Sequence, residues 1–266
     1  MYSLLRNPSA KTGISLLLIL FAVAICAPLL ATHDPYALEP AASKLSPSTH
    51  HFLGTDYAGR DIFSRLLYSM RLAYYGGCIA ISITASIGIL LGTAAGYYGK
   101  WFDAAVMRIV DAWLAIPGLL FLFVVIATTG DGFYPIVLAV GLAGIPSFTR
   151  LVRGGAINET KQPYVEAARM IGVLPMRIAL KHIAPNLVSP LVTYLASGFG
   201  SAILAAGSLG FIGLIENPTT PELGQLLREG REMMNHTWWP ILGPILVIWL
   251  TMLATNLISD GVSEKR

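Results

Sequence analysis

A short polar group in this chain combines residue types that suit the binding of another protein: Glu166, Ala167, Ala168, Arg169 and Gly172. The two small alanines would let a partner approach closely, and the acidic and basic side chains would fix the partner's orientation. A charged stretch is often only a solvated loop, which here would simply join two membrane helices. The ordered spacing of the group argues against a loop that only joins two helices.

These residues lie within a polar and basic stretch, 158–185, that separates two long apolar runs. Pro163 suits the first position of a helix, because the N–H that proline lacks would have no partner there. Gly172 permits a sharp turn, since glycine has no Cβ to forbid a positive φ. Pro175 can begin a second short helix. We therefore predict a helix–turn–helix at the membrane surface.

Six apolar segments without Asp, Glu, Lys, Arg or His indicate a membrane protein. Only 12% of all residues are charged, against roughly 25% in soluble domains. Each segment, as a helix, would cross most or all of a hydrocarbon core of about 30 Å. We expect an all-α fold with an anchor region (1–71), a core of five transmembrane helices (72–266) and a coupling loop (150–185). The segments are 14–31, 72–99, 112–130, 132–149, 183–215 and 237–259.

The distribution of lysine and arginine predicts the orientation of the chain in the membrane. Basic residues precede the first segment, fill the loop between the fourth and fifth, and close the chain. Because cytoplasmic loops carry the excess of basic residues, this loop and both termini should face the cytoplasm. The first segment could instead be a signal peptide, since Arg6 and Lys11 precede it, but it exceeds the usual core of about 7–15 residues. A retained anchor fits better.

The predicted outer face carries a second informative stretch, residues 50–71. Asp61 could cap an amphipathic helix with Ile62, Phe63 and Leu66 on its apolar face. We expect this helix to lie on the outer membrane surface; direct contact with a substrate is the alternative. The histidines His33, His50, His51 and His236 fall on the same face. A metal role for them is possible, but solvated loop histidines are the expectation, and no metal site is predicted.

Small and kink-forming residues within the segments predict how the helices pack. Gly88, Gly92 and Gly96 recur every four residues and would let two membrane helices approach closely. Pro117 predicts a kink in the third segment. Asp103 and Asp111 near the start of that segment are expected in interfacial ion pairs rather than a proton relay. The fifth segment has a small, mildly polar face that suits either an aqueous path or tight packing, formed by Ser197, Gly200, Ser201 and Ser208.

Two ordered motifs resemble a known family of membrane proteins. Glu166-Ala167-Ala168, then Gly172, then Ile183-Ala184-Pro185 resembles the EAA loop of ABC importer permeases. Leu53-Gly54-Thr55-Asp56, Gly59-Arg60-Asp61 and Ser64-Arg65-Leu66 together resemble the second-type permease subunit of dipeptide, oligopeptide and nickel importers. The family commonly has another glycine after Phe-Leu-Gly-Leu, where this chain has Ile215-Glu216-Asn217.

The resemblance implies a type I ABC importer permease fold of six transmembrane helices, working by alternating access. It implies that Glu166, Ala167, Ala168, Arg169, Gly172 and Pro185 couple the chain to ATPases. The implied partners are a homologous permease, two ATP-binding subunits and an external solute-binding protein. The chain has no Gly-x-x-x-x-Gly-Lys-Ser/Thr loop, so ATP and Mg²⁺ would bind to the partner subunits. No catalytic residue and no cofactor are expected in this chain.

Several functions remain open at this point. Dipeptides or oligopeptides are the first expectation for the transported solute, and nickel or another metal chelate is the second. A non-transporting membrane anchor is an alternative of another class. An intramembrane enzyme or a proton-coupled carrier is disfavoured, because the apolar segments contain no ionisable residues of the kind that such functions need. Nucleic acid is not an expected partner, since no basic run interleaved with aromatic residues occurs.

Overall fold

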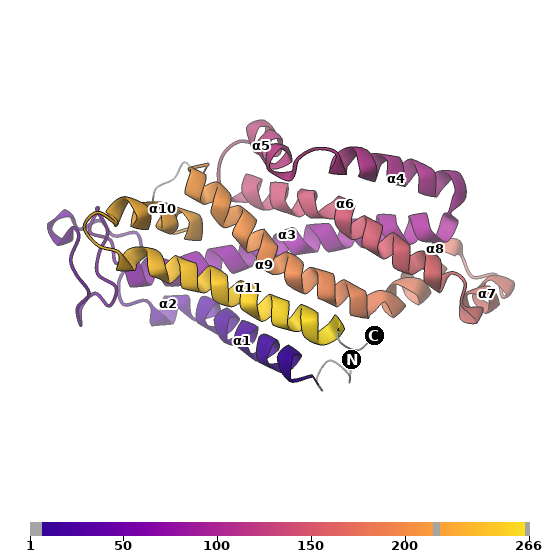
Figure 1. Cartoon of the computed structure of the whole chain (residues 1–266), viewed down its shortest axis with the longest axis horizontal. Coiled ribbons are helices and arrows are strands. Elements are labelled where there is room, and N and C mark those ends of the chain that lie inside the picture. Colours follow the sequence, from indigo (N-terminus) through magenta and orange to yellow (C-terminus); the bar gives the residue numbers. More distant parts are fainter. Residues whose placement is uncertain (1–6, 215–218, 264–266) are drawn as a thin grey trace.

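The computed structural model describes residues 7–214 and 219–263, which form a bundle of helices (Figure 1). Five helices are long and apolar enough to cross a membrane, and a sixth crossing arises if α4 (Lys100–Leu114) and α5 (Gly118–Thr129) make one broken span. This confirms the predicted all-α class. The long helices are α1 (Pro8–Ile25), α3 (Ile62–Tyr98), α6 (Phe133–Glu159), α9 (Val188–Ile212) and α11 (Leu242–Ser263).

The third predicted segment, 112–130, is not a single kinked helix. α4 and α5 meet at an angle of 91°, because Pro117 both lacks an amide hydrogen and disfavours a helical conformation at the residue before it. The carbonyl of Pro117 accepts the first hydrogen bond of α5, from the amide of Phe121 at 3.0 Å. Proline therefore ends one helix and begins the next.

The expected surface helix near residue 62 and the second predicted segment are one continuous helix. α3 has 37 residues, which at about 1.5 Å per residue exceeds the thickness of a hydrocarbon core. The prediction of a separate helix on the membrane surface was wrong. The prediction of its cap is confirmed, because the carboxylate of Asp61 accepts a hydrogen bond from the amide of Ser64 at 2.8 Å.

The contact between α3 and α6 depends on the three glycines that recur every four residues. A methyl group placed on Gly88, Gly92 or Gly96 would lie 2.6 Å from a carbon atom of α6, far inside an ordinary contact distance. Close approach of these two helices was predicted from the spacing and is confirmed. The facing pairs are Gly88 with Phe148, Gly92 with Val152, and Gly96 with Ala156.

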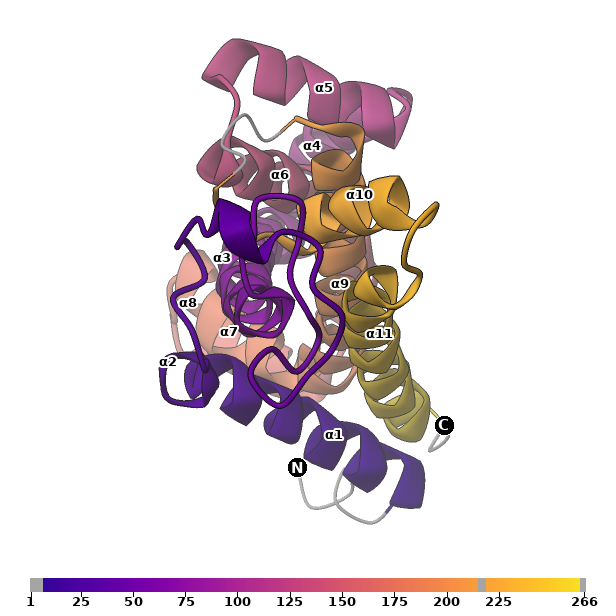
Figure 2. The same ribbon diagram turned by 90° about the vertical axis from the view of Figure 1, so that its left-hand side faces the viewer.

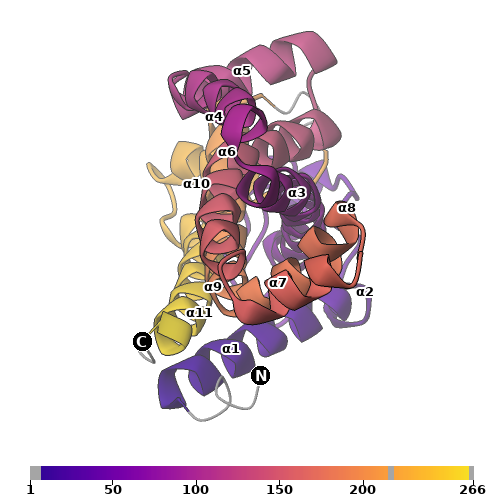
Figure 3. The ribbon, with the colours of Figure 1, turned by 90° about the vertical axis from the view of Figure 1, so that its right-hand side faces the viewer.

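The two ends of the bundle differ in structure. One end carries the segment from α2 (Ala27–Leu30) to the start of α3, together with α10 (Leu223–Met233) (Figure 2). The opposite end carries the short helices α7 (Pro163–Met170) and α8 (Pro175–Ile178) (Figure 3). α10 was not predicted. The departure from the family motif at 215–217 and the terminal residues Arg6, Lys265 and Arg266 lie outside the described residues.

Candidate docking site and transport path

The α7–α8 turn has the local structure that the sequence predicts. Pro163 and Pro175 each occupy the first position of their helix. Gly172 has φ +78° and follows the last turn of α7. Its amide donates to the carbonyl of Arg169 at 3.0 Å, and the amide of Val173 donates to the carbonyl of Ala168 at 3.1 Å. This hydrogen-bond pair is a Schellman motif, which ends a helix with a left-handed residue.

One face of the turn is built into the bundle. Val165 of α7 and Ile178 of α8 are completely buried, in one apolar cluster with Phe148 and Val152 of α6. Burying a side chain of this size contributes roughly 1.5–3 kcal/mol. A one-turn π-helix, Ala179–Ile183, continues from α8 and adds further buried contacts to the cluster. The turn is therefore held firmly against α6.

Hydrogen bonds of Tyr164 fix the base of the turn. The hydroxyl of Tyr164 donates to the carboxylate of Glu159 at 2.6 Å, at the end of α6. The side-chain amide of Asn186 donates to the same hydroxyl at 2.9 Å. These bonds join the chain entering α7 to the chain leaving the π-helix, so the two ends of the loop move together.

The opposite face of the turn exposes three large apolar side chains around Gly172. Met170 is 84% exposed, Ile171 is 81% exposed and Leu174 is 71% exposed. Contiguous exposed apolar residues mark interaction surfaces more often than isolated ones. Sequence reasoning missed these residues, although their position on either side of the turn glycine was a usable signal. We call Met170, Ile171 and Leu174 the apolar tip.

The predicted coupling residues occupy different faces of this unit. Glu166 and Ala167 are exposed, and Pro185 is exposed in the 3₁₀ turn Ala184–Leu187. Ala168 faces inward and is 9% exposed. Arg169 turns back toward α3, where its Nε donates to the hydroxyl of Tyr97 at 3.2 Å, and its guanidinium lies 4.8 Å from the centre of that ring.

Two ion pairs join α4 to α6. Asp103 pairs with Arg153, and Asp111 pairs with Arg150. Both pairs agree with the expectation of interfacial ion pairs. Because the second pair is more than half exposed on both sides, it contributes little to stability.

A groove of about 330 Å³ lies between α3, α5, α6 and α9. Ser197 and Ser201 line it, together with Thr84 and Tyr194, while apolar residues form the remaining walls. Gly200 points elsewhere: a methyl group there would meet Thr255 of α11 at 2.6 Å.

Ser208 is half-buried on α9, and its hydroxyl donates to the carbonyl of Leu204 at 2.8 Å. Serines that bond their own helix in this way keep their lone pairs available to an aqueous path. The four residues that the sequence analysis assigned to a polar face of the fifth segment (Ser197, Gly200, Ser201 and Ser208) therefore do not share one surface.

At the other end of the bundle, a buried ionic network joins α10 to the start of α3. The carboxylate of Glu229 accepts from Arg60 and from Arg65, each at 3.1 Å. Arg60 also pairs with Asp56 at 2.6 Å. The side chain of Arg65 has no exposure to solvent. Sequence motifs singled out these arginines but could not supply their shared partner, which lies 169 residues from Arg60 and 164 residues from Arg65.

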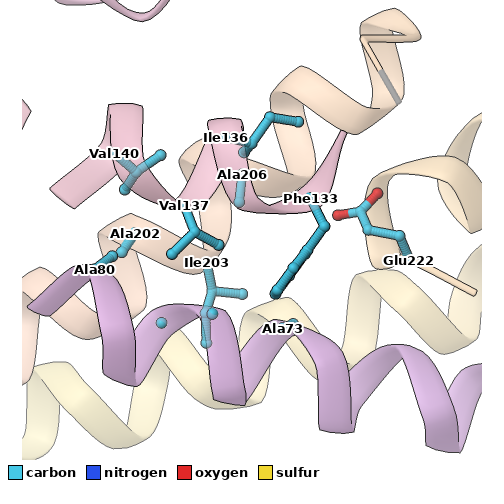
Figure 4. A pocket seen from close by; sticks show the side chains of 12 residues that line it. Ala73, Ala80, Phe133, Ile136, Val137, Val140, Ala202, Ile203, Ala206 and Glu222 are labelled. Atoms are coloured by element: carbon cyan, nitrogen blue, oxygen red, sulfur yellow. The ribbon is translucent and has the colours of Figure 1, made fainter. Parts of the chain in front are cut away.

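Glu222 caps α10 from a buried position on the border of a second, smaller cavity. Its carboxylate accepts from the amide of Gln225 at 3.0 Å. Figure 4 shows Glu222 at one end of this cavity of about 20 Å³, whose other lining side chains, including Phe133 and Ala73, are apolar. Burial raises the pKa of Glu222 from 4.5 to about 7.

The pH dependence of stability should change when Glu222 is replaced by glutamine. Between about pH 4.5 and 7 the folded protein binds a proton here that the unfolded chain has lost, so stability falls as pH rises through this window. Glu222→Gln removes that titration while keeping an oxygen that can cap α10. We expect the melting temperature of the variant in detergent to fall less than that of the wild type between pH 5 and 8. An equal fall in both proteins would contradict the assignment.

Comparisons with known proteins agree with this architecture. The profile of the family described as "Binding-protein-dependent transport system inner membrane component" matches residues 88–265. A second profile, "N-terminal TM domain of oligopeptide transport permease C", matches residues 1–47. The chain therefore belongs to the family of binding-protein-dependent transport system inner membrane components, which confirms the resemblance seen in the motifs.

Relatives in this family carry names of peptide transport systems. "Dipeptide transport system permease protein DppC" of Haemophilus influenzae is 36% identical over 97% of this chain and 90% of its own length. "Glutathione transport system permease protein GsiD" of Escherichia coli O157:H7 is 40% identical over 97% of this chain and 86% of its own. A chain of the inward-facing MetNI methionine ABC transporter has a similar fold, with a TM-score of 0.56 and 18% identity over 76% of this chain and 96% of that chain.

Proposed function

We propose that this chain is a permease subunit of an ATP-driven importer that carries dipeptides or other short peptides into the cell. One observation carries the proposal: the α7–α8 turn is buried against α6 on one face and presents the apolar tip on the other. A surface connection between two helices needs neither feature. An element that receives force from a partner needs both.

The partner that fits the apolar tip is an ATP-binding subunit, because the chain has no phosphate-binding loop of its own. Met170, Ile171 and Leu174 would enter a cleft of that subunit, with Glu166 and Ala167 beside them on the exposed face. By the positive-inside rule, the basic loop around the turn supports a cytoplasmic position for this end of the bundle and for both termini. A second permease, a second ATP-binding subunit and an external solute-binding protein complete the proposed complex.

Movement of the turn would reach the transport path through packed helices. Val165 and Ile178 contact the cluster on α6, and α6 in turn contacts α3 along the glycine series. A displacement of α7 and α8 would therefore shift α6 and α3 and alter the groove that Ser197 and Ser201 line. The ATP-bound and ATP-free partners must bind the turn differently, since a ligand shifts an equilibrium only by its difference in affinity for the two states.

The experiment is uptake into proteoliposomes that contain the complete complex. We expect labelled dipeptide to accumulate only when ATP is enclosed with the ATP-binding subunits and the binding protein is present on the other side. An excess of unlabelled dipeptide should abolish the signal, and an excess of Ni²⁺ should not. Accumulation of labelled Ni²⁺ without accumulation of peptide would contradict the proposed substrate class. A complex that assembles without ATP but takes up neither peptide nor Ni²⁺ would favour the anchor function.

A further inference from the structure

Three of the histidines from the predicted outer face lie together at the α10 end of the bundle. One ring nitrogen of each of His33, His50 and His51 lies within 4.8 Å of the other two. The ring centres are 4.4 Å apart for His33 and His51 and 5.0 Å apart for His33 and His50. His51 is buried, His33 is half-buried and His50 is exposed. The cluster thus has a closed side and a side open to solvent.

The Nδ1 atoms of His51 and His33 are hydrogen-bonded to groups outside the cluster, which leaves their Nε2 atoms to bind a metal. Nε2 of His33 now shares a hydrogen bond with Nδ1 of His50, which a bound ion would replace. Nδ1 of His51 lies 2.9 Å from the carboxylate of Asp61, a residue that is itself 2% exposed. Nδ1 of His33 lies 2.9 Å from the hydroxyl of Thr32. A ring that donates through Nδ1 has its lone pair on Nε2. A carboxylate behind a histidine is a recurrent support for metal ligands, because it fixes the ring and raises its basicity.

Hydrogen bonds hold the backbone of His51 and of His33 in place. The amide of Ser48 donates to the carbonyl of His51 at 2.8 Å, and the amide of His51 donates to the hydroxyl of Ser48 at 3.0 Å. The amide of His33 donates to the hydroxyl of Ser64 at 3.1 Å. The backbone of two of the three ligands is therefore fixed before any ligand arrives.

The separation of two of these nitrogens suits a shared ion. Nε2 of His33 and Nδ1 of His50 are 3.2 Å apart. Two imidazole nitrogens at about 2.05 Å from one tetrahedral Zn²⁺ would be about 3.3 Å apart. Imidazole nitrogens suit divalent transition metals, whereas Mg²⁺ and Ca²⁺ prefer oxygen ligands. Three imidazoles would leave one coordination position of a tetrahedral ion open.

We propose that His33, His50 and His51 form a binding site for a divalent transition-metal ion of the Zn²⁺ type, with Asp61 orienting His51. The ion would clamp the segment after α2 to the first turn of α3, because Asp61 caps that helix. The site differs from the sequence expectation of solvated loop histidines, since the fold brings residues 17 positions apart into contact. It does not rest on the identity of the transported solute.

The test is Zn²⁺ binding to the purified complete complex in detergent, after removal of metals with a chelator. We expect wild-type complex to bind one more Zn²⁺ per copy of this subunit than complexes carrying His33→Gln or His50→Gln, with affinity at the site reduced at least tenfold in each variant. His236→Gln is the matched control, since His236 is an exposed histidine outside the cluster and should leave the binding unchanged. X-ray absorption of the wild type should show nitrogen ligands at about 2.0 Å.

Thermal melting separates loss of the site from loss of the fold. With chelator present, His50→Gln should melt at the wild-type temperature, because the side chain is exposed. Added Zn²⁺ should raise the melting temperature of the wild type and of His236→Gln, but not of the two cluster variants. Equal Zn²⁺ binding by wild type and both cluster variants, or no saturable binding by any of them, would overturn the proposal.

Discussion

Replacing Gly172 by valine is expected to reduce ATP-driven uptake by about 30-fold or more, while the subunit still reaches the membrane. Gly172 has φ +78°, a conformation that costs residues with a Cβ about 1–2 kcal/mol, with β-branched residues at the upper end. A cost of about 2 kcal/mol lowers the equilibrium constant for forming this turn about 30-fold. No atom lies within 4 Å of a Cβ placed there. The effect therefore comes from the backbone and not from a clash.

Two further variants distinguish backbone strain at position 172 from a general effect of side-chain size. Gly172→Asn should retain most uptake, because asparagine tolerates the left-handed conformation. Gly154→Ala is the control, since Gly154 is helical in α6 and a methyl group there also meets open space. Uptake and ATP hydrolysis should be measured together in proteoliposomes. Wild-type uptake by Gly172→Val would refute the requirement for the left-handed turn.

Replacing Glu229 by alanine is expected to destabilise the α10 end of the bundle by about 3–5 kcal/mol. Glu229 accepts from Arg60, Arg65 and Gln225, and the side chain of Arg65 has no exposure. Without Glu229, Arg60 and Arg65 lose a shared carboxylate, and Asp56 lies 3.7 Å from Nε of Arg65. Removing one member of a buried pair leaves a charge that the protein interior cannot solvate.

The melting temperature of the purified complex in detergent measures this effect. We expect a fall of roughly 10 °C for Glu229→Ala, on the usual relation between free energy and melting temperature. Glu232→Ala is the matched control, because Glu232 is exposed on the same helix. Its backbone carbonyl accepts from the hydroxyl of Tyr57 at 3.0 Å, and the substitution keeps that carbonyl. Similar melting of the two variants would show that the network does not hold α10 in place.

Local signals predicted the helices and the turn of the α7–α8 unit, and long-range contacts account for what they missed. Pro163, Gly172 and Pro175 specify the ends of α7 and α8 through backbone chemistry alone, so their roles follow from residue type. The apolar tip depends on which face of the turn α6 covers, and sequence spacing does not specify that face. The continuity of α3 was missed because the predicted apolar segment began at residue 72, directly after Arg71, with a further charge at Arg65. In the structure, Glu229 neutralises the charge of Arg65.

The same reasoning explains the other differences from expectation. A hydropathy count over 112–130 records the length of an apolar run but not the 91° bend within it. The cluster of His33, His50 and His51 could not be predicted, because it forms only when the segment after α2 folds back on the start of α3. Of the serine-rich face of α9, Ser197 and Ser201 line the groove, whereas Gly200 packs against α11. The helical period of the sequence alone does not specify which neighbouring helix packs against each side of α9.

The most direct measurement of the central claim is site-specific photocrosslinking from Ile171 in membranes that contain the whole complex. A photoreactive amino acid at Ile171, which is 81% exposed at the apolar tip, should form adducts with an ATP-binding subunit, and their yield should change when ATP is added. The same probe at Leu29, which is 85% exposed at the opposite end of the bundle, should form no such adduct. The account is contradicted if Ile171 yields no adduct with an ATP-binding subunit, or if Leu29 yields as much.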